Sequence, residues 1–179
     1  MEFKQLSETR RSIRAYDGTK SVTREQVEEI IASAIEAPSW KNSQTARFYC
    51  AVGEKAAERL RDECLPSFNA HNTVGAAYIV TAFVKDVSGF DVPNGKPANE
   101  IGNGWGYYDL GLSSMLLTLK AKEMGLGTLI MGIRDADKIR EFLGIPENEL
   151  ITAVIAVGYP AADPRHTKRK PVEAVAKFF

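Results

Sequence analysis

One predicted helix, residues 107–124, restricts the possible folds more than any other part of the chain. Between residues 108 and 119 it carries a single charge, Asp109, and its leucine and methionine side chains cover more than one helical face. A helix that is apolar most of the way round must be buried on most sides. It is therefore either the central helix of a monomer or, as a chain of this size favours, a helix that also packs against a partner surface.

Three further helices are predicted from their ends and their apolar spacing. Thr23 has the features of an N-cap, Gln26 can complete a capping box, and Pro38 ends this helix. Residues 54–64 form the second predicted helix, and the third begins after Asp135 and closes at Gly144. These helices are interspersed with strands.

Strands are predicted at residues 47–52, 76–84, 128–132 and 150–157. The second and the fourth are apolar on both alternating faces, which is typical of strands covered on both sides. Because helices and strands do not strictly alternate, we predict an α+β fold with one layer of sheet flanked by helices, in a single domain over residues 1–179.

Composition excludes several classes of function. Lys plus Arg and Asp plus Glu both number 23, and this net charge of zero argues against broad nucleic-acid binding. No apolar run is long enough to span a bilayer, and the first residues lack the apolar core of a signal peptide, so we expect a cytoplasmic protein without a membrane partner. The two cysteines should stay reduced, with Cys50 a buried thiol in a strand. The two histidines lack the spacing of metal ligands, so no metal site is predicted.

Residues 10–14 concentrate three arginines and a serine: Arg10, Arg11, Ser12 and Arg14, with Ile13 between the last two. Guanidinium groups offer planar pairs of donors that match phosphate oxygens and stay charged near neutral pH. The segment is therefore a candidate anion site. The alternative is a solvated basic surface at a helix end, where arginine complements the helix dipole.

Three other segments are predicted loops. Residues 38–45 join hydroxyls and amides to one large aromatic residue, Trp40, so they are either a simple connection or a recognition loop. Residues 68–72 form a second polar loop. Residues 86–104 are rich in Gly, Pro and Asn and form either a lid or an ordinary surface loop.

Taken together and in order, these segments resemble the nitroreductase family of FMN-dependent oxidoreductases over nearly the whole chain. The motifs that carry the resemblance are residues 10–14, 38–44, 125–127 before Met131-Gly132, 143–146, 158–160 and 169–171. The resemblance implies a mostly antiparallel central sheet flanked by helices, in a homodimer. The chain departs from the family pattern at Trp40, at Thr45-Ala46 and at Met131, which puts the substrate in doubt.

The resemblance also implies the residues that bind FMN. Arg10, Ser12 and Arg169 correspond to residues that hold the phosphate, and Arg14 corresponds to one that reaches the flavin pyrimidine edge. Pro38, Ser39, Trp40 and Asn42 would come from the second subunit, and Asn69 would contact the ring edge. Leu129, Ile130, Met131 and Gly132 would pack along the flavin, with a backbone N–H near Met131 facing N5. Arg11 and Gln44 lie within the same motifs and complete the predicted cofactor-binding set.

The implied activity is NAD(P)H-dependent reduction of nitroaromatics, quinones or similar electron-poor acceptors by ping-pong hydride transfer. The flavin carries this chemistry, so no catalytic side chain is predicted. FMN is expected rather than FAD, because no GxGxxG turn for a pyrophosphate is present. Two alternatives stay open: a specialised flavin dehalogenase or dehydrogenase of one metabolite, and a flavin-binding module without turnover.

Overall fold

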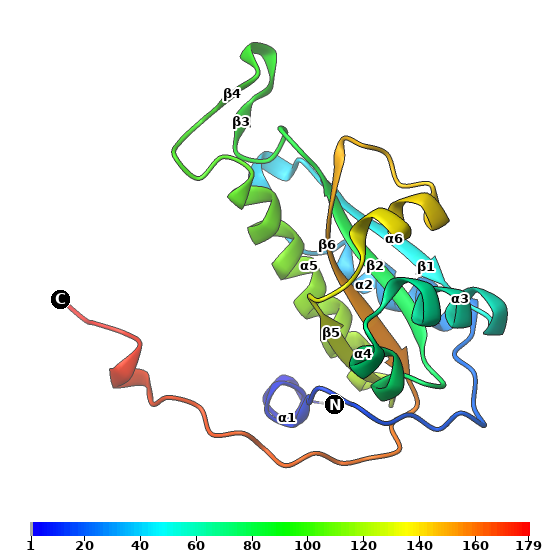
Figure 1. Cartoon of the computed structure of the whole chain (residues 1–179). Coiled ribbons are helices and arrows are strands. Elements are labelled where there is room, and N and C mark those ends of the chain that lie inside the picture. The colour runs from blue at the N-terminus through cyan, green and yellow to red at the C-terminus, as the bar shows by residue number, and fades with distance from the viewer. Residues whose placement is uncertain (1) are drawn as a thin grey trace.

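A four-stranded sheet forms the centre of the molecule. The structure is a computed structural model and describes residues 2–179. Its strands are β1 (Ala46–Ala51), β2 (Ala77–Val84), β5 (Gly127–Met131) and β6 (Glu149–Gly158), and they lie in the order β1-β2-β6-β5 (Figure 1). All three neighbouring pairs are antiparallel. The predicted α+β fold with a mostly antiparallel sheet is confirmed.

Helices cover both faces of this sheet. On one face lie α2 (Arg24–Ala34) and α5 (Gly104–Glu123), which build a core around Ile30, Leu117 and Ile155. On the other face lie α3 (Glu54–Cys64), α4 (Ser67–Asn72) and α6 (Ala136–Leu143), which build a core around Leu60, Val80 and Ile139. The central strands β2 and β6 are therefore buried on both faces, as their apolar sequences predict.

Hydrogen bonds confirm the predicted start of α2 and both ends of α6, whereas α2 ends at Ala34, before the predicted stop at Pro38. The Thr23 hydroxyl accepts from the Gln26 N–H at 3.3 Å, and the Gln26 side chain accepts from the Thr23 N–H at 3.0 Å. The Asp135 side chain accepts from the Lys138 N–H at 3.1 Å. Gly144 ends α6 in the left-handed region at φ 63°, which a residue without Cβ adopts freely.

Two sequence-based expectations are wrong. Residues 68–72 belong to a short helix, α4, and do not form a polar loop. Cys50 is exposed, since β1 is an edge strand; both cysteines are free.

Residues 86–104 project from the body as an excursion (Figure 1). Within it, β3 (Phe90–Asp91) and β4 (Lys96–Pro97) form a small hairpin.

The long helix α5 is only partly covered within one chain. Leu110 and Leu117 are buried against the sheet, whereas Tyr108 is 60% exposed and Met115 is 44% exposed. These two side chains share a face with Gly111, beside which a Cβ would meet no atom within 4 Å. The expected burial on most sides is therefore not achieved by a single chain.

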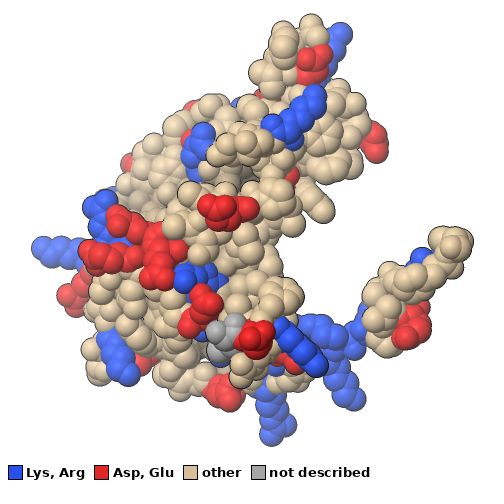
Figure 2. All heavy atoms as spheres, turned by 180° about the vertical axis from the view of Figure 1, so that it is seen from behind, with Lys and Arg blue, Asp and Glu red and all other residues tan. Residues whose placement is uncertain are grey.

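The exposed face of α5 borders a hollow. The 86–104 excursion and the C-terminal segment both project on this side of the body, and Figure 2 shows the hollow between them lined mostly by uncharged residues. The C-terminal segment, with its short helix η3 (Val172–Ala174), runs out from the body and exposes Val175 and Phe178. Within residues 2–179, no helix has both the length and the apolar character to cross a membrane.

Candidate functional site

The arginine segment lies along the outer edge of β5, directly after α1 (Phe3–Thr9). Ser12 forms a parallel bridge with Thr128, and the Ile13 N–H donates to the Thr128 carbonyl at 2.9 Å. The contact depends on Gly127, because a Cβ there would approach Ile13 Cγ1 to 2.5 Å. The sheet edge therefore fixes where the arginines lie.

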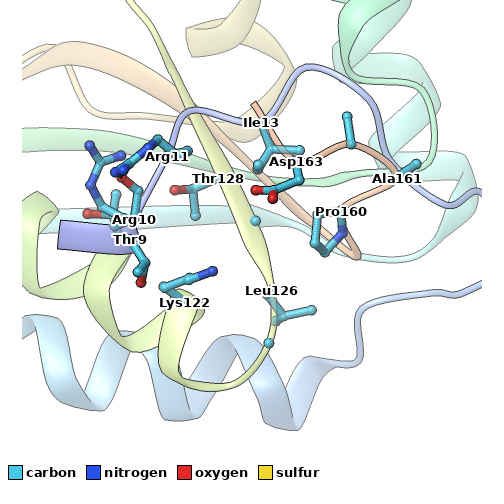
Figure 3. A pocket seen from close by; sticks show the side chains of 14 residues that line it. Thr9, Arg10, Arg11, Ile13, Lys122, Leu126, Thr128, Pro160, Ala161 and Asp163 are labelled. Atoms are coloured by element: carbon cyan, nitrogen blue, oxygen red, sulfur yellow. Dashed lines mark hydrogen bonds between the residues drawn. The ribbon is translucent and has the colours of Figure 1, made fainter. Parts of the chain in front are cut away.

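A pocket of about 560 Å³ opens beside this segment (Figure 3). Arg10 and Arg11 line it together with Lys122 from the last turn of α5. The rest of its lining comes from the end of α1, the end of α5, the start of β5 and the residues after β6: Thr9, Ile13, Thr118, Gly125, Leu126, Gly127, Thr128, Pro160, Ala161, Ala162 and Asp163. Its volume is within the range of small-molecule sites.

The positive charges near this pocket are not compensated by ion pairs. Partial burial, followed by the charges of Arg11 and Arg169, lowers the pKa of the Arg10 guanidinium. None of the ion pairs among residues 2–179 involves these three arginines. Asp163 is the only carboxylate in the lining. The site thus has the charge of an anion site: Arg10 and Arg11 line the pocket, and the charge of Arg169, which does not line it, also acts on Arg10.

Ser12 and Arg14 occupy different positions. Ser12 lies next to the pocket on the β5 edge but does not line it, and Arg14 is exposed. Sequence reasoning missed Thr118, Lys122 and Asp163. Lys122 is a basic residue in the last turn of a helix, which is a weak signal, and only the folded chain shows that it meets Arg10 and Arg11.

Strand β5 exposes its outer backbone edge to a ligand, but only some of its predicted flavin-packing side chains are accessible. Leu129 and Met131 are buried in the core, and only Ile130, 53% exposed, and Gly132 are accessible among the four predicted flavin-packing residues. The Met131 side chain is therefore turned into the core, and its backbone pairs with Val154 of β6, so it does not face the outer edge. Because the Thr128 carbonyl points to the outer edge, alternation along the strand turns the Ile130 N–H to that edge as well.

Asn69 lies beside the residues that follow β5. It is 7% exposed on α4, and its Nδ2 donates to the Ile133 carbonyl at 3.0 Å. This bond ties α4 to the end of the strand and occupies one of the amide donors. The contact between Asn69 and the flavin ring stays a prediction.

The loop of residues 38–45 lies elsewhere. Its Trp40 N–H donates to Asp109 Oδ2 at 2.9 Å, near the start of α5, whereas the arginine pocket adjoins Thr118 and Lys122 near the end. At about 1.5 Å per residue, Asp109 and Lys122 are roughly 20 Å apart along the helix. One chain therefore does not bring the loop residues Pro38, Ser39, Trp40, Asn42 and Gln44 to the arginines.

Comparison with known proteins gives consistent matches. A model of the Nitroreductase family matches residues 8–159. A Bacillus subtilis (strain 168) protein provisionally named NAD(P)H nitroreductase YdgI is 24% identical over 205 residues, covering 99% of this chain and 97% of that protein.

Solved structures share the fold. A nitroreductase family protein from Streptococcus pneumoniae TIGR4 superposes with a TM-score of 0.83 at 22% identity, covering 99% of this chain and 100% of that chain. A provisionally named nitroreductase from Exiguobacterium sibiricum 255-15, solved in complex with FMN, superposes with a TM-score of 0.79 at 23% identity, covering 100% of this chain and 98% of that chain.

Proposed function

Because the chain belongs to the nitroreductase family, we propose that it is an FMN-dependent oxidoreductase that takes hydride from NADH or NADPH and reduces electron-poor acceptors such as nitroaromatics and quinones. The observation that carries this proposal is that Arg10 and Arg11 line a pocket beside the outer edge of β5 without ion-pair partners, with the charge of Arg169 also acting on Arg10. The positive charge of the arginines suits a phosphate, and the neighbouring edge of β5 suits a flat heteroaromatic ring joined to it.

The phosphate end of FMN fits the cation cluster. Arg10 and Arg169 would hold the phosphate, with Ser12 as a neutral donor at the edge of β5. Charge-assisted bonds from guanidinium to phosphate are among the stronger hydrogen bonds in proteins. The half-buried Arg10 gains most, since an anion would offset its partial burial and the repulsion of the other two guanidiniums.

The ring end fits the outer edge of β5. The exposed Ile130 side chain offers an apolar contact, and the Ile130 N–H faces the same edge. When bound, FMN supplies the hydride chemistry, and the chain supplies binding and orientation. Arg14 would place positive charge near the pyrimidine part of the ring, where reduction adds negative charge.

The complete site would be shared between two copies of the chain. Loop 38–45 lies about 20 Å along α5 from the arginine pocket, so it cannot complete that pocket in the same chain. A symmetric dimer built on the exposed face of α5 would present each loop to the partner's arginines, twice over. The exposed Tyr108 and Met115 and the outstretched C-terminal segment support such a dimer.

Turnover would follow a ping-pong order. In a site open on one face of the ring, the nicotinamide must leave before the acceptor can stack there. Double-reciprocal plots at several acceptor concentrations should give parallel lines, and intersecting lines would contradict this order.

The first experiment asks whether the purified protein holds FMN and turns over. We expect a yellow protein that bleaches anaerobically with NADH or NADPH and regains its colour with a nitroaromatic or a quinone. Cofactor released by heat should chromatograph as FMN, and FAD would contradict the proposal. Bound flavin that does not bleach would instead indicate a flavin-binding module without turnover.

A further inference from the structure

Asp109 joins three segments of the chain through one buried carboxylate. It is 5% exposed on α5, and its Oδ2 accepts from the Trp40 backbone N–H at 2.9 Å and from the Ser88 hydroxyl. Trp40 belongs to the 38–45 loop, and Ser88 belongs to the 86–104 excursion. Burying a polar group this deeply costs free energy unless it is hydrogen-bonded, and the two donors to Asp109 come from the two segments that border the exposed start of α5.

The loop that Asp109 holds has an unusual backbone. Lys41, Asn42 and Gln44 have φ values of 48°, 55° and 49°, in the left-handed region that residues with a Cβ avoid. Polar side chains within the loop are also incompletely satisfied, because Trp40 Nε1, Ser43 Oγ and Thr45 Oγ1 are buried without partners among the described residues. Such a conformation persists only where the surroundings impose it.

Asp109 also fixes an aromatic cluster, consisting of Trp40, Trp105 and Tyr108. The Trp40 and Trp105 ring centroids lie 4.7 Å apart, and those of Trp105 and Tyr108 lie 5.6 Å apart. Trp105 precedes Asp109 by one helical turn, so the bond from the Trp40 N–H to the carboxylate brings the Trp40 ring against Trp105. Asn99 of the excursion accepts from Trp105 Nε1 at 3.0 Å.

We propose that Asp109 is a positioning residue that holds Trp40 and the 86–104 excursion as one aromatic wall on the acceptor side of the shared site. This inference rests on the proposed function. The wall leaves Tyr108 60% exposed next to the loop that would face the partner's flavin. Planar aromatic acceptors would stack on it, with ring contacts of the kind that already hold the two tryptophans together.

The test compares Asp109→Leu with Asp109→Asn. Asparagine keeps an oxygen that can accept from both donors, whereas leucine leaves both donors without an acceptor. Trp40 and Trp105 are the only tryptophans in the chain, so near-UV circular dichroism of the flavin-free protein reports their stacking. We expect the tryptophan signal to survive in Asp109→Asn and to be lost in Asp109→Leu.

Kinetics then separate positioning from general stability. In flavin-loaded protein, Asp109→Leu should raise the KM for a quinone by about tenfold or more, the scale of one hydrogen bond to a charged group, with a smaller change in kcat. Asp109→Asn should stay within about threefold of wild type. The matched control is Glu149→Leu, which removes a carboxylate of similar burial, 6% exposed, that accepts from the Tyr49 hydroxyl at 2.8 Å. It should leave the KM and the tryptophan signal unchanged.

Each outcome decides the proposal. An unchanged tryptophan signal in Asp109→Leu, or a lost signal with an unchanged KM, would overturn it, and so would a Glu149→Leu variant with the same kinetic defect. If Asp109→Leu does not fold, hydrogen exchange on the wild-type protein decides: the Trp40 amide should be protected, and exchange at the rate of a free peptide would overturn the proposal. If wild type holds no flavin, the proposed function fails, but the tryptophan signal still tests the contact.

Discussion

The two ends of α5 carry two different kinds of polar site. At its C-terminal end, Lys122 joins Arg10 and Arg11 around an open pocket, and the arginines lack carboxylate partners. At its N-terminal end, the buried Asp109 carboxylate accepts two hydrogen bonds at Oδ2, from Trp40 and Ser88. The first end has positive charge that a ligand could pair with, whereas the second uses its carboxylate to hold other segments of the chain and offers aromatic surface.

On the proposed function, each chain would contribute two half-sites. The C-terminal end of α5, with its cations, would bind an anionic cofactor, and the N-terminal end, with its aromatic rings, would shape the space for a flat acceptor. A separation of about 20 Å along a rigid helix prevents one chain from combining them at a single ring. The following predictions test this comparison in order of decreasing expected effect.

A carboxylate introduced on the exposed face of α5 should have the largest effect, because it should prevent the proposed dimer from forming. Met115→Glu places a carboxylate where the proposed dimer would bury it, at a cost of about 3–5 kcal/mol for an unpaired buried charge. We expect sedimentation of a dimer for wild type and of a monomer or unfolded chain for Met115→Glu, with loss of bound FMN. Val74→Glu, at a side chain 54% exposed away from α5, is the control and should remain dimeric. A Met115→Glu dimer of normal affinity would contradict the assigned interface.

Loss of one arginine should weaken FMN binding at the arginine pocket and leave the aromatic cluster unchanged. Arg10→Ala and Arg169→Ala should each weaken FMN binding by about 1.5–3 kcal/mol, the usual scale of a charge-assisted hydrogen bond. Titration of flavin fluorescence measures this loss. Arg165→Ala removes another exposed cation of the C-terminal segment and should leave FMN affinity unchanged. Equal losses in all three variants would indicate non-specific attraction instead of a phosphate site.

Gly127→Ala should displace the arginine segment from its support. The new Cβ would lie 2.5 Å from Ile13 Cγ1, and overpacking of this kind costs about 1–3 kcal/mol of folding free energy. Denaturant unfolding should show the loss, and FMN affinity should fall with it. Gly18→Ala meets no atom within 4 Å and is the control. A Gly127→Ala protein as stable as wild type would show that the segment is not fixed by this contact.

Tyr49 lies away from both ends and should affect stability only. Burial, followed by its hydrogen bond to Glu149, raises the pKa of Tyr49 to about 12. The neutral hydroxyl is thus favoured in the folded state, so its contribution is complete below the ordinary tyrosine pKa and is lost as pH rises toward 12. Because solvent screens this group, the difference between wild type and Tyr49→Phe should fall by less than about 1 kcal/mol over that interval. FMN affinity should not change.

Local sequence signals predicted most of the fold. Thr23 with Gln26, Asp135 and Gly144 encode helix ends through hydrogen bonds and backbone freedom within a few residues, and all of these ends are confirmed. The helix α4 was missed because its polar residues match a loop equally well, and its buried Asn69 is paired with a residue 64 positions away. The exposure of Cys50 was missed because strand composition does not reveal which strand lies at the edge.

The candidate site was predictable as motifs but not as an arrangement. Arg10 and Arg169 could be identified from residue chemistry and family resemblance, whereas Lys122 and Asp163 enter the pocket only through folding. Asp109 was visible as the lone charge in an apolar helix, yet its two donors lie 69 and 21 residues away. Contacts of such sequence separation leave no local pattern.

Subunit mixing tests the shared site most directly. Arg10→Ala damages the cation end, and Asn42→Ala damages the opposite loop, where alanine is also strained at a φ of 55°. Each homodimer should have little activity at limiting FMN. The two are unfolded and refolded together in equal amounts.

If each site combines the two ends from different chains, a mixed dimer has one doubly damaged site and one intact site. Random pairing then restores about a quarter of wild-type activity and FMN binding. If each chain builds its own site, every site carries one lesion, and activity that stays at the average of the two parents would contradict the shared site.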